Sequence, residues 1–289
     1  MVPAMASRRA VLFLFVAVAA SSIAVALGEA PAGPDYSYVS GTNLGPENWA
    51  KLSPKYSACN GGAPTRKQSP IDIVTKNAVP KPDLESLNRT YVASEATLIY
   101  NGKENSMTFP GKVGGVSIGG KSFSLKKVLW RTPSEHTVNG KRHPLEVQLV
   151  HESDAGTGEL AIIAILYKVG SPDSFYYQLK RELTELAGDK CNYAVDDARS
   201  PMGLVHLRSL QKRTGSYFRY MGSLTAPPCT ENVYWNVLGK VRKMTQEQLD
   251  MLLAPLPPAA KQNARPVQPL NGRVVQFYNP PHSTISFEV

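Results

Sequence analysis

Short stretches of alternating apolar and polar residues follow one another along most of the chain, with turn residues between them. An alternation of period two places successive side chains on opposite faces of a β-strand. The pattern predicts strands over residues 97–101, 106–109, 115–118, 122–130, 145–151, 160–169, 216–222 and 233–238. Residues 160–169 are apolar throughout, so we expect a central strand that is buried on both faces.

Two segments instead show helical spacing of apolar residues. One helix is predicted over residues 174–187, with Gly188 as its C-cap. The second begins at Thr245, where the sequence TQEQ forms a capping box, and Pro255 ends it. Many strands and few helices, with no linker or internal repeat between them, predict a single β-rich domain of the α+β class.

The N-terminus has the layout of a secretory signal peptide. Arg8 and Arg9 precede an apolar run from Val11 to Leu27, and small residues follow it. We therefore expect residues 1–28 to be cleaved, leaving a secreted domain over residues 29–289 with no membrane attachment. An uncleaved anchor and a twin-arginine signal are the alternative interpretations of this segment.

Charge and cysteine content narrow the class of protein further. The 32 basic residues exceed the 23 acidic ones, a formal net charge of +9. This surplus is spread along the chain without a basic arm, so nucleic acid is not an expected partner.

Of three cysteines, Cys59 and Cys229 lie in loops that a disulfide bridge could join, and Cys191 is the third. Asn88 begins an Asn-Arg-Thr acceptor for N-glycosylation.

A polar turn, TPSEH (132–136), directly follows the strand at 122–131 and contains Glu135. On that strand, Leu129 and Arg131 project to the same side. Gln148 lies on the strand at 145–151, on the face that also carries Glu146. If the two strands pair, the side chains of Leu129, Arg131 and Gln148 converge beside the turn.

Five segments resemble the α-class carbonic anhydrases, over a span from about Tyr36 to Tyr278. They are GPENWAKL (45–52), KQSPIDI (67–73), PSEHTVNGKRHPLEVQLVHES (133–153), RYMGSLTAPPCTENVYW (219–235) and ARPVQPLNGR (264–273). The resemblance is to the plant members, which include nectar proteins and dioscorins. It implies one domain with a ten-stranded, mainly antiparallel twisted sheet, peripheral helices, a conical central site and a disulfide between Cys59 and Cys229. In a plant, the predicted destination is the apoplast, with the vacuole or the plastid lumen as alternatives.

The family's catalysis depends on three histidines that hold a zinc ion and leave one position for water. By the resemblance, those three positions are Leu129, Arg131 and Gln148 here. Leucine has no donor atom, arginine has a fixed positive charge, and a neutral amide is a poor zinc ligand. We therefore predict no metal and no other cofactor at this site.

The resemblance assigns roles to other residues as well. Thr225 and Glu135 match the pair that orients the zinc-bound hydroxide, and Glu146 matches the carboxylate that orients the third histidine. Lys103 occupies the proton-shuttle position, and an unperturbed lysine, with a pKa of about 10.4, transfers protons poorly at neutral pH. The pocket wall is expected to comprise Val150, Ile162, Leu224, Ala226 and Trp235.

Two further expectations concern buried charge. The five histidines do not share metal-ligand spacing, and the resemblance implies that His136 and His151 are structural and hydrogen-bonded beneath the site. An unpaired buried guanidinium would be costly, so we expect the carboxylate of Glu146 or Glu135 to neutralise Arg131.

These features favour a catalytically silent member of the family with a storage or extracellular binding role. One alternative is a zinc-dependent carbonic anhydrase that converts carbon dioxide and water to bicarbonate. Another is a dioscorin-like reductase of dehydroascorbate, with Cys191 as its thiol and Lys190 lowering the thiol pKa. A third is a binding module in which Arg131 and Lys103 attract a small anion into the vacated site.

Overall fold

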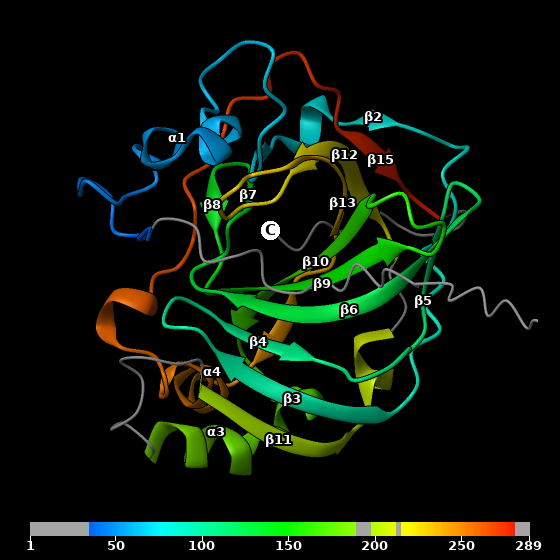
Figure 1. Cartoon of the computed structure of the whole chain (residues 1–289). Helices are drawn as coiled ribbons and strands as arrows, with labels where there is room; N and C mark the ends of the chain where they lie inside the picture. The colour runs from blue at the N-terminus through cyan, green and yellow to red at the C-terminus, as the bar shows by residue number, and fades with distance from the viewer. Residues whose placement is uncertain (1–34, 189–197, 212–214, 281–289) are drawn as a thin grey trace, which may run out of the picture. The chain divides into compact units, whose positions relative to one another are not determined.

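The structure, a computed structural model, describes residues 35–188, 198–211 and 215–280 (Figure 1). The predicted signal peptide and Cys191 lie outside these residues. Helices of the described residues are α1 (Trp49–Leu52), α2 (Ser174–Tyr177), α3 (Lys180–Gly188) and α4 (Gln246–Leu253). Shorter 3-10 turns are η1 (Pro54–Cys59), η2 (Thr75–Asn77), η3 (Leu207–Gln211) and η4 (Pro258–Ala260). None of the described helices is long and apolar enough to cross a bilayer.

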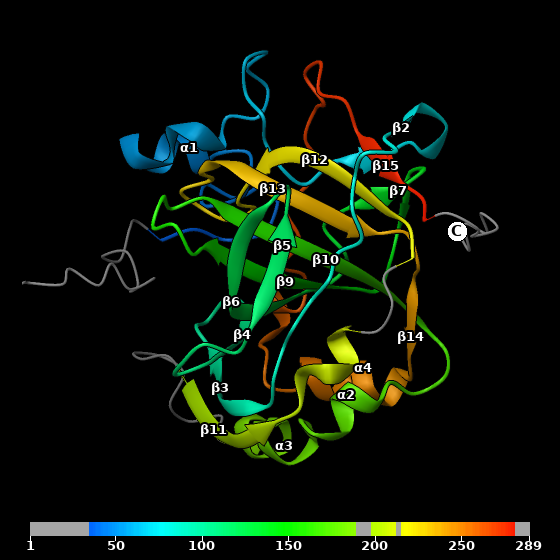
Figure 2. The same ribbon diagram turned by 90° about the vertical axis from the view of Figure 1, so that its right-hand side faces the viewer.

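Strands form one large sheet and one small sheet. The large sheet contains β2 (Val79–Pro80), β3 (Ser94–Tyr100), β4 (Asn105–Thr108), β5 (Gly115–Ile118), β6 (Lys121–Arg131), β9 (Leu145–Ser153), β10 (Leu160–Val169), β11 (Ala198–Val205), β12 (Tyr217–Ser223), β13 (Glu231–Leu238), β14 (Arg242–Met244) and β15 (Gln276–Tyr278). The small sheet contains β1 (Asp72–Ile73), β7 (Thr137–Val138) and β8 (Lys141–Arg142). Figure 2 shows α2, α3 and α4 gathered at one end of the large sheet and α1 at the other.

The large sheet has twelve strands where ten were predicted. Ten of them form a continuous path, β11-β3-β4-β6-β9-β10-β13-β12-β15-β2, and β5 and β14 pair at its side. The additional strands fit because β6 and β10 are longer than their neighbours. On β6, β5 pairs with Lys121–Ser124 and β4 with Lys127–Trp130. Strand β10 is shared in the same way: β13 pairs with its first half, Leu160–Ala164, and β14 with its second half, Tyr167–Val169.

Pairing in this sheet is mixed but mainly antiparallel. The parallel pairs are β10–β13, β10–β14 and β15–β2. The outermost strands carry Pro201 in β11 and Pro80 in β2. Because proline has no backbone N–H to donate, these two positions weaken the sheet edges as templates for another strand.

Strand β10 is buried on both faces, as predicted from its apolar run. Ile163 and Ile165 belong to the core cluster that contains residues of α2, α3 and α4. Ile162 and Leu166 belong to a second cluster, on the opposite face, with Leu129 and Trp235. The period-two alternation of a strand explains this division, because neighbouring side chains point to opposite faces.

The two predicted helices are present with one difference. The capping box at Thr245 is confirmed, since its hydroxyl accepts from Gln248 N and the Gln248 side chain accepts from Thr245 N. The helix predicted over 174–187 is divided into α2 and α3. At the division, Gln178 N and Leu179 N donate to carbonyls three residues earlier, which tightens the chain into a single 3-10 turn.

The disulfide between Cys59 and Cys229 is confirmed, with Cα atoms 5.1 Å apart across 170 residues of chain. Both cysteines are buried in a small aromatic cluster with Tyr38 and Trp49. The bridge therefore joins the N-terminal segment to the loop between β12 and β13. Asn88 is exposed, and its glycosylation stays a prediction.

Candidate functional site

The candidate site lies where the end of β6 meets β9. The two strands pair antiparallel, with Leu129 opposite Gln148 and Arg131 opposite Glu146. Leu129 belongs to the core cluster on one face of the sheet, whereas Trp130 belongs to the cluster on the other. The predicted convergence of Leu129, Arg131 and Gln148 is thus produced by strand register.

Arg131 is the buried cation of this site, with 2% of its surface exposed. Its Nη1 is in ion-pair contact with Glu104 Oε2 and donates to Tyr38 Oη at 3.0 Å. Its Nε lies 3.5 Å from Glu135 Oε2. The expectation that Glu146 or Glu135 neutralises Arg131 is met by Glu135, together with Glu104, which was not predicted. Glu146 instead accepts from His136 and Gln148.

Electrostatics explains how the guanidinium remains charged. Burial alone lowers the pKa of Arg131, but the Glu104 carboxylate raises it, and the net pKa lies above the ordinary value. Burial likewise acts to raise the pKa of Glu104, yet Arg131 brings the net pKa below its usual range. The two groups therefore stabilise each other's charged forms.

Gln148 connects the carboxylates of Glu135 and Glu146. Its Nε2 donates to Glu135 Oε2 at 2.7 Å and to Glu146 Oε1 at 2.9 Å. Glu135 Oε1 also accepts from Arg265 N at 2.9 Å. Burial raises the pKa of the Glu135 carboxyl, and the charge of Arg131 offsets part of that rise. The amide of Gln148 thus donates its N–H groups to the carboxylates on either side.

Glu146 also holds His136 in place. Its Oε2 accepts from His136 N at 2.8 Å, and its Oε1 lies 2.9 Å from His136 Nδ1. Burial would raise the pKa of Glu146, but His136 and these hydrogen bonds bring the net pKa below its usual range. His136 Nε2 lies 2.7 Å from Tyr220 Oη. His136 is therefore buried with both ring nitrogens occupied.

His151 is also buried and hydrogen-bonded. Its Nδ1 lies 3.1 Å from the Ala161 carbonyl, which can only accept, so Nδ1 carries the proton. Its Nε2 then accepts from Tyr91 Oη at 2.7 Å. Burial lowers the pKa of His151 to about 4.

This shift predicts a loss of stability in acid. An unfolded histidine has a pKa of about 6.5, so between pH 6.5 and 4 the unfolded chain binds a proton that the folded His151 does not. Stability therefore falls as the pH falls through this window, by about 3 kcal/mol for this group. Urea unfolding of wild type and His151→Gln over this range measures the effect.

The variant should show a flatter pH dependence than wild type, while His206→Gln, at an exposed position, should leave the slope unchanged. Equal slopes for wild type and His151→Gln would contradict the assignment.

The structure also brings together the predicted hydroxide-orienting pair. Thr225 is buried, and a hydrogen bond between its hydroxyl and the Glu135 carboxylate lowers the pKa of that carboxyl against the larger effect of burial. Lys103 lies in the loop between β3 and β4. Its Nζ is 2.8 Å from Asp35 Oδ1 and 5.0 Å from the centre of the Tyr36 ring. Lys103 therefore already has a carboxylate partner.

Residues of the predicted pocket wall come from neighbouring strands. Ile162 is in register with Val150 on one side and Trp235 on the other, and all three are buried. Leu224 is half-buried and packs against the same cluster, which includes Leu129. Ala226 is half-buried next to Thr225. Val150, Ile162, Leu224 and Trp235 thus lie in one apolar cluster with Leu129, and their role as the wall of a substrate pocket stays a prediction.

Sequence reasoning did not identify Glu104 or Tyr38, the two nearest partners of Arg131. Strand pairing contains a signal for Glu104: Asn105 is opposite Trp130, so Glu104 falls beside Arg131. Tyr38 reaches the site from the N-terminal segment, and no local pattern predicts that contact.

The residues at the three histidine positions do not fit a zinc ion. Leu129 has a hydrocarbon side chain, Arg131 is a cation in contact with two carboxylates, and Gln148 Nε2 donates to Glu135 Oε2 and Glu146 Oε1. A zinc ligand must instead direct a lone pair at the metal. Across the described ranges, no group of three or more His, Cys, Asp or Glu side chains is arranged to hold a metal ion.

Comparisons with known proteins agree with the architecture and the motifs. Residues 44–279 match the family model described as eukaryotic-type carbonic anhydrase. Alpha carbonic anhydrase 7 of Arabidopsis thaliana is 36% identical over 267 residues, covering 92% of this chain and 93% of that protein. Dioscorin DB3L of Dioscorea polystachya is 38% identical over 249 residues, covering 86% and 88%.

A solved structure of similar fold is a crystal structure of dioscorin complexed with ascorbate. It has a TM-score of 0.79 and 35% sequence identity, and the match covers 86% of this chain and all of that one. The twisted β-sheet, the disulfide, the Thr225–Glu135 pair and these similarities lead to one assignment. The chain belongs to the α-class carbonic anhydrase family, alongside plant α-carbonic anhydrases and dioscorins.

Proposed function

We propose that this protein is a catalytically silent α-carbonic anhydrase, in which an ion-pair cluster replaces the zinc centre. The observation that carries the proposal is the buried contact of Arg131 with Glu104 and Glu135. At a ligand position, the Arg131 guanidinium fills the space of an imidazole, has no lone pair to offer a metal, and engages the carboxylates of Glu104 and Glu135. Without the metal, nothing in the cluster lowers the pKa of a water to about 7.

Two measurements on the purified protein test this proposal together. We expect zinc well below one equivalent by elemental analysis, and a stopped-flow rate of carbon dioxide hydration equal to that of buffer. An active α-carbonic anhydrase purified in the same way is the positive control. Stoichiometric zinc together with acetazolamide-sensitive turnover would establish the alternative, a zinc-dependent hydratase.

Secretion is part of the same proposal. Its support is the predicted signal peptide together with the Cys59–Cys229 disulfide, since such bridges persist in oxidising compartments. A protein that is secreted and lacks catalytic activity is suited to a storage role or to binding outside the cell, and this is the role that we propose.

The ion pairs of the central site disfavour binding of a small anion there. Both cations that would attract it, Arg131 and Lys103, already have carboxylate partners that the anion would have to displace.

Reduction of dehydroascorbate is the second candidate function. The observation that favours it is the similarity to the dioscorin that was crystallised with ascorbate. In this chain Cys59 and Cys229 form the disulfide, so the reaction would fall to Cys191, which lies outside the described residues. A reductase assay with glutathione on wild type and Cys191→Ser decides the point. Activity that is lost in the variant would favour the reductase.

A further inference from the structure

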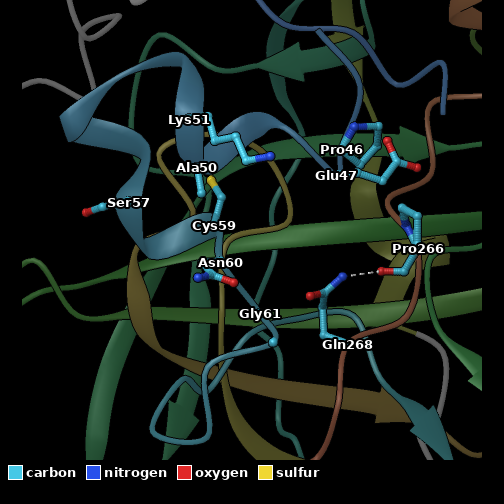
Figure 3. A pocket seen from close by; sticks show the side chains of 11 residues that line it. Pro46, Glu47, Ala50, Lys51, Ser57, Cys59, Asn60, Gly61, Pro266 and Gln268 are labelled. Atoms are coloured by element: carbon cyan, nitrogen blue, oxygen red, sulfur yellow. Dashed lines mark hydrogen bonds between the residues drawn. The ribbon is translucent and has the colours of Figure 1, made fainter. Parts of the chain in front are cut away.

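Two surface hollows border the segment Ala264–Gln268. The larger, about 470 Å³, lies between α1, η1 and Gln268, as Figure 3 shows. It carries one charge of each sign, and its polar side chains have partners nearby. Lys51 Nζ donates to Asn48 Oδ1 at 3.4 Å, and Gln268 Nε2 donates to Pro266 O at 2.8 Å. Glu47 accepts from Gly41 N at 3.4 Å. This hollow therefore offers no excess charge to a ligand.

The smaller hollow, about 380 Å³, has a different character, and we call it the Arg142 pocket. Its lining includes Tyr38, Pro133, Arg142, Pro258, Gln262 and Pro266. Three proline rings and a tyrosine ring make its walls largely apolar. Arg142 is the one charged residue among the described residues that line it. An apolar hollow with few polar groups is the usual composition of a small-molecule site, and its volume lies within the usual range.

Arg142 differs from the cations of the central site in that no carboxylate of the described residues pairs with it. Its Nη1 donates to the carbonyl of Ser134. Within the described part of the chain, no Asp or Glu oxygen lies within 4.0 Å of its guanidinium. Arg131, by contrast, contacts two carboxylates. A guanidinium has five N–H donors in a planar fork that matches both oxygens of a carboxylate, so Arg142 retains the capacity to bind one.

Tyr38 gives the pocket a rigid wall. Its hydroxyl accepts from Arg131 Nη1 at 3.0 Å, and its ring packs edge-on against Trp49 with centroids 5.4 Å apart. A side chain held at both ends loses little freedom when a ligand packs against it, which favours binding.

We propose that the Arg142 pocket binds a small planar monocarboxylate with an apolar body, such as an aromatic acid. The carboxylate pairs with the Arg142 guanidinium, and the apolar body packs between the proline rings and Tyr38. The site is separate from the zinc-ligand positions, so this proposal goes beyond the proposed function and holds whether or not the protein hydrates carbon dioxide.

Isothermal titration calorimetry of the mature chain tests the proposal with benzoate, its neutral analogue benzamide, and acetate. Benzoate is expected to bind with a dissociation constant of about 1 mM or tighter. Benzamide, which lacks the charge, and acetate, which lacks the ring, should each bind at least about tenfold more weakly. The replacement Arg142→Gln should weaken benzoate by at least about tenfold as well.

Lys141→Gln is the matched control, because it removes a positive charge from the adjacent, exposed position of β8 that does not line the pocket. This variant should bind benzoate as wild type does. If Arg142→Gln fails to fold, Arg142→Lys keeps the charge without the planar fork and should bind benzoate with lower affinity. No benzoate binding at 10 mM would overturn the proposal, and so would equal affinities for benzoate and benzamide. Equal affinities for benzoate and acetate, or wild-type affinity in the folded Arg142 variant, would overturn it too.

Discussion

Replacing Arg131 by methionine is expected to lower the free energy of unfolding by about 3–5 kcal/mol. The apolar side chain fills a similar volume but leaves Glu104 and Glu135 buried without a cation. Uncompensated buried carboxylates carry a large desolvation cost. Urea unfolding at neutral pH, where wild-type Glu104 is ionised, measures the loss.

A double-mutant cycle identifies the source of that loss. Glu104→Gln in the Arg131→Met background removes one of the two unpaired charges, so the double variant should be more stable than Arg131→Met alone. Lys103→Met is the control, because it breaks an ion pair with the exposed residue Asp35 and should cost less than about 1 kcal/mol. Additive effects of the two substitutions would contradict direct pairing of Arg131 with Glu104.

Zinc binding is expected to appear when histidines are introduced at the three ligand positions. The variant combines Leu129→His, Arg131→His and Gln148→His with Glu104→Gln, which avoids leaving a buried carboxylate without its partner. Register already brings these positions together, and Glu146 lies within hydrogen-bond reach of the side chain at position 148. We expect one zinc per chain, bound at least about a thousandfold more tightly than by wild type.

Competition with a chelator measures the zinc affinity, and the visible spectrum of the cobalt-substituted protein reports tetrahedral coordination. The matched control retains Arg131 and carries only Leu129→His and Gln148→His. Its two imidazoles beside a fixed positive charge should bind zinc far more weakly. A folded four-substitution variant without zinc would show that these side chains do not converge as the strand register indicates.

Local patterns in the sequence were sufficient to predict the strands that carry the ligand positions. Alternation placed Leu129 and Arg131 on one face of β6 and Trp130 on the other, and the apolar run located β10 at the centre of the sheet. These predictions succeed because side-chain direction follows from position along a strand. The resemblance to a known family then predicted the fold, because five motifs occur in the family's order along most of the domain.

Contacts between segments that are distant in the sequence could be identified only from the tertiary structure. The twelve-stranded sheet exceeds the expected ten because the lengths of β6 and β10 allow two neighbours along one edge. A strand's neighbours depend on where other segments end, which its own alternation does not encode. The same applies to the division of the predicted helix into α2 and α3.

The sequence by itself, through its motif resemblance, placed Arg131 at a zinc-ligand position and predicted that a carboxylate neutralises it. That prediction needs no structure, because the desolvation cost of a buried charge does not depend on which residue supplies its partner. Only the tertiary structure decided that Glu104 and Glu135 neutralise it, while Glu146 holds His136 and Gln148. All three carboxylates lie near the end of β6, and their assignment depends on side-chain direction and on the donors each one meets. Which carboxylate pairs with Arg131 is therefore decided only when the domain packs and β4, β9, the turn after β6 and the N-terminal segment meet.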